Sequence, residues 1–189
     1  MSVERSVLCL VLGICLSLLF SGAALAAEIA GPEVALKENS IVVSSSLSLS
    51  EAELKDIRNG IPKEIIFHVD LFRVWPYWPD EFVLGAAFTK TLRCDPVKKE
   101  YVATSFDGMT LTEKRFSGCE PLAAWALRAP EFKLTNVSEL APDLYFVRVT
   151  AESRLRRLPP VINHLLFFVR EKEFSVSKDS ERFQAGGRK

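Results

Sequence analysis

The chain has 189 residues, of which 48% are hydrophobic and 25% are charged, a composition typical of one globular domain with a sizeable core. Basic and acidic residues number 24 each, so the formal net charge is zero, which argues against a nucleic-acid-binding surface. Two histidines and four cysteines leave few ligands for a metal site.

The first 26 residues have the pattern of a secretory signal peptide. Val7–Leu19 is almost wholly apolar, and small residues follow it up to Ala24-Leu25-Ala26, the Ala-x-Ala pattern of a signal peptidase site. We therefore predict cleavage after Ala26 and a mature protein that is exported, most simply to the periplasm. The alternative is an uncleaved membrane anchor formed by residues 7–27, which are long enough to span a thin bilayer.

The mature chain is expected to begin with a loosely held polar leader, residues 27–40, followed by one domain over residues 41–183. Ile41–Leu49 alternates apolar and serine residues and predicts a strand. Ser50 and Glu53 have the spacing of a capping box and predict a helix that ends at Asn59-Gly60.

Four extended segments then follow one another without an intervening helix. They are Lys63–Trp75, Phe82–Asp95, Glu100–Phe106 and Met109–Phe116, with Asp107-Gly108 as a strong hairpin signal. In the first strand Phe67, Val69 and Leu71 share one face, and a loss of phase after Leu71 indicates a bulge.

The last third of the domain mixes short helices and strands. Ser117–Pro121 predicts a second capped helix that ends near Ala129-Pro130, and strands are expected over residues 132–137, 144–153 and 173–177. Residues 161–169 form an apolar run that predicts a short buried helix, and residues 184–189 are expected to be a disordered tail. The predicted fold is mainly β or α+β, with an antiparallel curved sheet or sandwich of about seven strands and two or three short helices.

Two cysteines remain after cleavage, and the strand directions suggest that they pair. Cys94 lies at the end of one predicted strand, and Cys119 lies just beyond the strand that runs in the same direction two places away. Disulfides persist in exported proteins, so we predict a Cys94–Cys119 disulfide, with two separate buried thiols as the alternative.

The order of these elements resembles a family of exported bacterial proteins, domain-of-unknown-function family 4390. The resemblance rests on the capped helix, on Asn59-Gly60-Ile61-Pro62, on the Phe67-x-Val69-x-Leu71 strand with its aromatic turn, and on Phe174–Ser177. It covers residues 41–183 and implies a single exported domain. The family has no assigned activity to carry over.

The sequence contains no recognisable catalytic or metal-binding motif. It lacks a phosphate-binding glycine loop, His-Glu-x-x-His, Cys-x-x-Cys and Gly-x-Ser-x-Gly. His68 and Asp70 share a strand face, and a nearby serine would complete a hydrolytic triad, but a polar face meeting solvent is the simpler interpretation. We therefore expect no enzyme activity, no cofactor and no metal.

Two surface features are candidates for binding. Trp75-Pro76-Tyr77-Trp78-Pro79 concentrates three large rings at a strand-connecting turn, and the strand directions place it beside Asp107-Gly108 and opposite the cysteines. Trp75, Tyr77 and Trp78 either fold back to plug the core or stay exposed to contact a partner protein, a membrane surface or a carbohydrate. Arg154, Arg156 and Arg157 form a small basic cluster that either contacts an anion or pairs with nearby acids.

These observations favour a non-catalytic exported module that binds or assembles with an envelope protein or the membrane surface, without nucleic acid. The alternative is a carrier of a lipid or other apolar ligand inside a curved sheet, which requires a cavity of at least about 300 Å³. A small hydrolase that uses His68 and Asp70 is a third reading.

Overall fold

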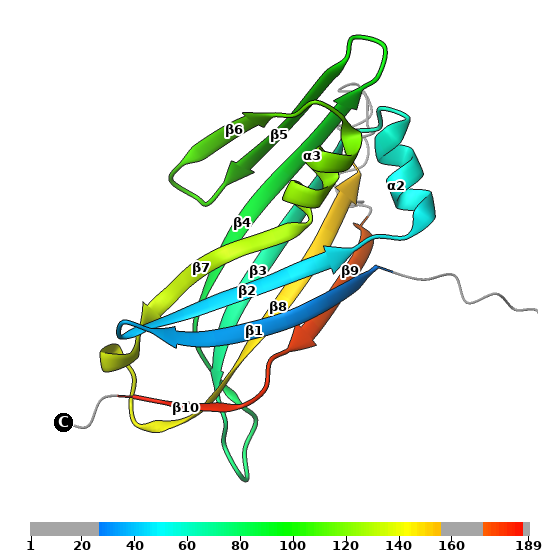
Figure 1. Ribbon diagram of the computed structural model, residues 1–189. Coiled ribbons are helices and arrows are strands. Elements are labelled where there is room, and N and C mark those ends of the chain that lie inside the picture. The colour runs from blue at the N-terminus through cyan, green and yellow to red at the C-terminus, as the bar shows by residue number, and fades with distance from the viewer. Residues whose placement is uncertain (1–26, 156–171, 187–189) are drawn as a thin grey trace, which may run out of the picture.

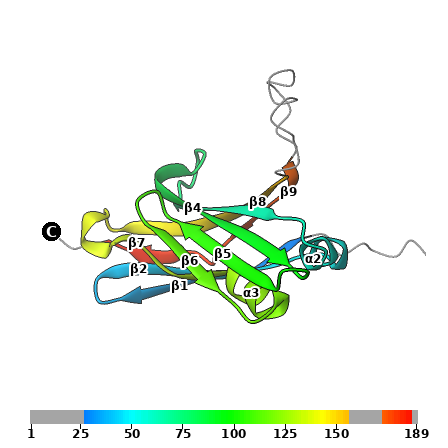
Figure 2. The same ribbon diagram turned by 90° about the horizontal axis from the view of Figure 1, so that it is seen from above.

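The computed structural model describes residues 27–155 and 172–186, which form two antiparallel sheets packed face to face (Figure 1). The large sheet has seven strands in the order β10-β8-β3-β4-β5-β6, with β9 also paired to β8. The small sheet has the order β1-β2-β7 and lies across one face of the large sheet (Figures 1 and 2). The predicted mainly-β, antiparallel fold is confirmed.

The strands of the large sheet are β3 (Lys63–Arg73), β4 (Glu81–Asp95), β5 (Glu100–Phe106), β6 (Leu111–Arg115), β8 (Asp143–Leu155), β9 (Lys172–Asp179) and β10 (Phe183–Ala185). Those of the small sheet are β1 (Glu28–Lys37), β2 (Ser40–Ser48) and β7 (Arg128–Asn136). Two α-helices, α2 (Glu51–Arg58) and α3 (Cys119–Ala126), and a 3₁₀ turn, η1 (Val137–Glu139), connect the sheets.

Residues 28–37 are not the loose leader that the sequence predicted, because they form strand β1. A tight turn at Glu38 and Asn39, both with positive φ (45° and 63°), returns the chain into β2. The apolar alternation of β1 is broken between Ala30 and Glu33, where the register with β2 shifts. Because of this irregularity the sequence pattern did not predict β1 as a strand, although Ile29 is buried in the core.

The long strand β3 lies between β4 and β8 and has the predicted two faces. Phe67, Val69 and Leu71 are buried, whereas His68 and Asp70 lie on the outer face, away from the small sheet. The predicted loss of phase is a register shift in the β3–β4 ladder, where Leu71 pairs with Leu84 but Phe72 pairs with Phe82. The extra residue, Val83, is on β4 and turns Phe82 to the outer face.

The hairpin of β5 and β6 is much shorter than β4. Phe106, the last residue of β5, pairs with Thr89, so the turn at Asp107-Gly108 lies halfway along β4 and not beside the aromatic turn as predicted. The predicted direction of the meander was correct, but β5 has 7 residues against the 15 of β4, so its end does not reach the aromatic turn.

Both helices cap one end of the sandwich. Helix α2 has the predicted capping box, because the Ser50 hydroxyl accepts from the Glu53 backbone N–H and the Glu53 carboxylate accepts from the Ser50 N–H. The predicted cap of the second helix was wrong, because α3 begins one residue later than predicted and has Gly118 as its N-cap. Gly118 has no side chain to accept a hydrogen bond. The helix ends at Ala126, so β7 starts where helix was expected.

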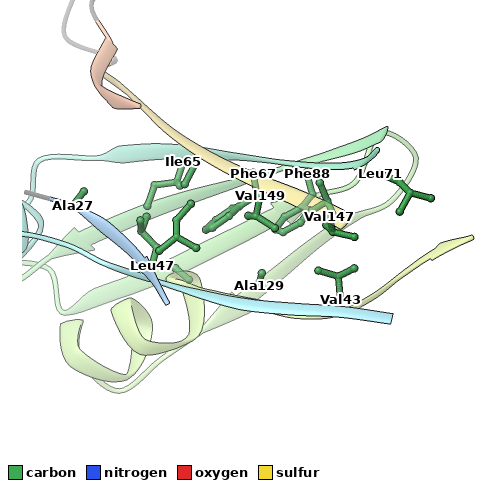
Figure 3. Close-up of a cluster of buried hydrophobic side chains, with 14 of the residues drawn as sticks. Ala27, Val43, Leu47, Ile65, Phe67, Leu71, Phe88, Ala129, Val147 and Val149 are labelled. Carbon is green, nitrogen blue, oxygen red and sulfur yellow. The ribbon is translucent and has the colours of Figure 1, made fainter. Parts of the chain in front are cut away.

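The core fills the space between the two sheets (Figure 3). Phe67, Val149 and Phe88 of the large sheet face Val43 and Leu47 of the small sheet. The rings of Phe67 and Phe88 stack with centroids 5.0 Å apart. This packing determines which β4 side chains point into the core and which point to solvent.

The C-terminal segment is more ordered than predicted, because Gln184 and Ala185 belong to β10, which pairs with the start of β8. The predicted signal segment 1–26 and the predicted helix over residues 161–169 lie outside the described residues.

Candidate binding surface

The residues between β3 and β4, Trp75–Asp80, form the aromatic turn at the end of β4 that lies opposite Cys94. Trp75 is anchored: its backbone N–H donates to the Asp80 carboxylate (3.3 Å) and its indole Nε1 donates to the Glu81 carboxylate (3.1 Å). Arg73 lies over its ring with a separation of 5.9 Å. The turn thus has a fixed base, and the prolines at 76 and 79 restrict its backbone.

The rings of the aromatic turn do not plug the core. Trp75 is 44% exposed, Trp78 is 77% exposed and Tyr77 is 93% exposed. Figure 2 shows the loop between β3 and β4 bending away from the small sheet, toward the outer face of the large sheet. These side chains are therefore available to a partner, as one of the two sequence interpretations predicted.

Next to the turn, the outer face of the large sheet carries an aromatic cluster of Phe72, Phe82 and Phe146. The rings of Phe72 and Phe146 stack at 5.3 Å, and Phe82 meets Phe72 edge-on at 5.8 Å. The Arg148 guanidinium lies over Phe72 (5.1 Å) and Phe146 (5.6 Å) and makes two hydrogen bonds to Asp179, of 2.7 and 2.8 Å. The cluster lies at the base of the aromatic turn, since Phe72 is near the end of β3 and Phe82 is near the start of β4.

Beside this cluster, the first half of β4 is an open sheet edge. Within the described residues β4 pairs with β5 only from Thr89 onward, so Glu81–Phe88 has β3 on one side and no strand on the other. The stretch Phe82–Phe88 contains no charged residue and no proline. We call Glu81–Phe88 the open edge.

The tip of the β5–β6 hairpin, Phe106–Leu111, bounds the open edge at its other end. The Asp107 carboxylate accepts from the backbone N–H groups of Met109 (3.0 Å) and Thr110 (2.7 Å), and these bonds lower the pKa of Asp107. Gly108 adopts φ +96°, which suits the turn. The fixed tip exposes Phe106, Met109 and Leu111.

His68 and Asp70 lie on the outer face of β3 as predicted. Burial raises the pKa of the Asp70 carboxyl, and the positive charges of His68 and Arg148 partly offset this effect. Thr150 stands opposite His68 in the ladder, but its hydroxyl is hydrogen-bonded to that of Ser177 (2.8 Å). The arrangement is that of a polar sheet face, and no group of metal-ligating side chains occurs among the described residues.

Only one member of the predicted basic cluster lies in the described part of the chain. Arg154 is on the outer face of β8, opposite Glu64 of β3. Arg156 and Arg157 lie outside the described residues, so the predicted anion contact stays a prediction.

Cys94 and Cys119 form a disulfide at the pole opposite the aromatic turn, with their Cα atoms 5.9 Å apart. It links the end of β4 to the first residue of α3. The predicted placement of the rings at one end and the sulfurs at the other is therefore confirmed (Figure 1).

Two lysines that the sequence analysis did not single out are buried on the inner face of the large sheet. Lys90 is 2% exposed, and its Nζ donates to the backbone carbonyls of Trp125 (3.1 Å) and Arg128, at the end of α3. Burial lowers the pKa of Lys90 to about 8. Lys63 instead forms an ion pair with Glu173, near Asp56 (3.5 Å). Lys90 lies two residues from Phe88, and Lys63 lies two residues from Ile65. This spacing puts each lysine on the buried face of its strand and could have identified both from the sequence.

Two open hollows occur among the described residues, one on the small sheet and one at the edge where the two sheets meet. One of about 360 Å³ is lined by polar residues around Ser44–Ser46, and one of about 540 Å³ lies between β1 and the segment 178–183. The interior itself is filled by the core side chains. Both hollows are open and partly polar, and the carrier of an apolar ligand stays a prediction.

These features define a small two-sheet β-domain, closed by a disulfide at one pole and presenting an aromatic turn and an open edge at the other. No helix in the described residues is both long and apolar enough to span a bilayer. The family described as Domain of unknown function (DUF4390) matches residues 24–181, and the chain belongs to this family. Neither a curated protein nor a solved structure matches the chain.

Proposed function

We propose that this protein is a non-catalytic binding or assembly module of the bacterial envelope, exported to the periplasm, that recognises a protein partner through the aromatic turn. The observation that carries the proposal is the exposure of Tyr77 and Trp78 on a base held by Trp75 and Glu81. Rigid, exposed aromatic side chains contribute much of the binding energy at protein interfaces because little entropy is lost when they are covered.

The placement in the envelope rests on the predicted signal segment and agrees with the disulfide, since disulfides persist in oxidising compartments. Trp and Tyr are equally suited to lipid headgroups, so a membrane surface is the competing partner.

The test replaces Tyr77 and Trp78 together by alanine. We expect the double variant to fold with unchanged unfolding free energy and to lose at least tenfold of its partner capture in a crosslinking pull-down, because both side chains are exposed. The matched control is Val97→Ala, which removes an equally exposed hydrophobic side chain at the opposite end of β4.

Unchanged capture by the double variant would contradict the role of the aromatic turn. Flotation with vesicles of phosphatidylethanolamine and phosphatidylglycerol distinguishes a protein partner from a membrane surface. Vesicle binding that depends on Tyr77 and Trp78 would show that the aromatic turn binds the membrane and not a protein.

A further inference from the structure

Seven of the nine large hydrophobic side chains that are exposed in the described residues flank the open edge of β4. Four of them lie at the aromatic end of the edge: Trp75, Tyr77, Trp78 and Phe82. The other three lie at the hairpin tip: Phe106, Met109 and Leu111. We propose that two copies of this chain pair through their open edges, with the aromatic turn of each copy packed against the hairpin tip of the other. This inference rests on the proposed function and names the partner of the same surface.

The edge itself determines the kind of occupant. Along Glu81–Phe88 the outward-pointing backbone N–H and C=O groups of β4 have no strand to bond with in the described residues, and another extended strand is their natural complement. Strand edges that stay single usually carry charges, a proline or a covering element. Among the described residues the open edge carries a charge at Glu81 and a bulge at Val83, both at one end, whereas Leu84–Phe88 is regular and uncharged.

Symmetry selects a second copy over an unrelated strand. When two identical edges pair antiparallel about a two-fold axis near Gly85, the first residue of one open edge lies beside the last residue of the other. The aromatic turn of each copy then meets the hairpin tip of its partner. The two apolar groups at opposite ends of the open edge are thus brought together twice in the dimer.

The apolar groups of both copies also lie on the same face of the paired sheets. A two-fold axis perpendicular to the sheet keeps the outer faces of both copies on the same side. Phe106 pairs with Leu111 and both point to the outer face, the side toward which the aromatic turn bends (Figure 2). Gly85 and Ala87 are exposed and small, so the two strands can approach without displacing large side chains.

The exposed area is sufficient for a stable dimer. The seven side chains are 43–95% exposed. With about 150–250 Å² for each large aromatic side chain, they present on the order of 900 Å² of apolar surface per copy. A standard interface takes about 800 Å² from each partner.

The first experiment is Ala87→Lys, which places a charge on the exposed face of the open edge. The matched control is Ala30→Lys, the same substitution at an exposed position of β1, the edge strand of the small sheet. Sedimentation equilibrium of the full chain, as processed and purified from cells, should show a dimer for the wild type and the control, and at least a tenfold weaker dimer for Ala87→Lys. A wild type that stays monomeric over the concentration range, or equal dimers for all three, would overturn the proposal.

The second experiment places a photo-crosslinking residue at position 77 in cells. We expect a product of two copies joined between position 77 and the hairpin tip, and Ala87→Lys should reduce its yield. A crosslink to a different protein, with no self-product, would refute the second copy and leave the proposed binding module standing. The absence of any crosslink would refute both.

Discussion

Lys90 offers a direct test of the packing at the end of α3. Its ammonium group is buried against the carbonyls of Trp125 and Arg128, and its Nζ lies 4.6 Å from the centre of the Trp125 ring. No carboxylate is hydrogen-bonded to it among the described residues, so its burial is the cause of a pKa lowered from 10.5 to about 8.

The sign of the pH dependence follows from this depressed pKa. Between pH 8 and 10.5 the unfolded chain holds the Lys90 proton while the folded chain releases it, so the free energy of unfolding rises with pH in this range. Below pH 8 the cost of burying the charge is fully present. Allowing for partial screening by solvent, the gain is about 1 kcal/mol at pH 9 and about 2 kcal/mol at pH 10, relative to pH 7.

The assay is urea unfolding of the wild type and of Lys90→Met at pH 7, 8, 9 and 10. Methionine has a similar length without the charge, and the difference between the two profiles removes the contributions of all other titrating groups. We expect the wild type to gain stability relative to the variant from pH 8 upward. Parallel profiles would show that the Lys90 ammonium is not desolvated, and the reasoning would be refuted.

Two further predictions concern the ends and the middle of β4. Replacing both Cys94 and Cys119 by alanine should lower the free energy of unfolding by about 3 kcal/mol, since a bridge across 25 residues restricts the unfolded chain, and urea unfolding of the variant with and without reductant should then coincide. Gly85→Ala should lower the melting temperature because its Cβ would lie 2.2 Å from the Asp70 carboxylate, and Asp70→Ala in the same chain should restore most of the loss; no restoration would place the strain elsewhere.

Local patterns were sufficient to predict most of the individual elements. The alternation of Phe67, Val69 and Leu71 placed the inner face of β3, and the Ser50–Glu53 spacing placed the start of α2, because each depends on residues within one turn or one strand. The exposed aromatic turn was identified as a candidate for the same reason. Its exposure was not decided by the sequence, since it depends on how the loop bends relative to the sheet.

The missed features all depend on contacts between distant residues. Phe82 continues the alternation of Leu84, Ala86 and Phe88 in the sequence, but the extra residue Val83 turns its side chain to the outer face. The open edge arises because β5 ends at Phe106, opposite Thr89, while β4 extends beyond that point to Glu81. Neither strand alone contains this information, which belongs to their relative lengths.

The chain passes between the two sheets three times in the described residues, through α2, α3 and η1. The crossings at α2 and α3 lie at the cysteine pole, where the disulfide and the Lys90 hydrogen bonds fasten α3 to β4. The α3 crossing at this pole is therefore covalently cross-linked to β4, whereas the η1 crossing lies near the opposite pole, where the Val137 N–H donates to the Asn39 carbonyl (2.8 Å). Tyr77 and Trp78 project from the pole opposite the disulfide, so a partner bound there leaves the cross-linked end of the sandwich uncovered.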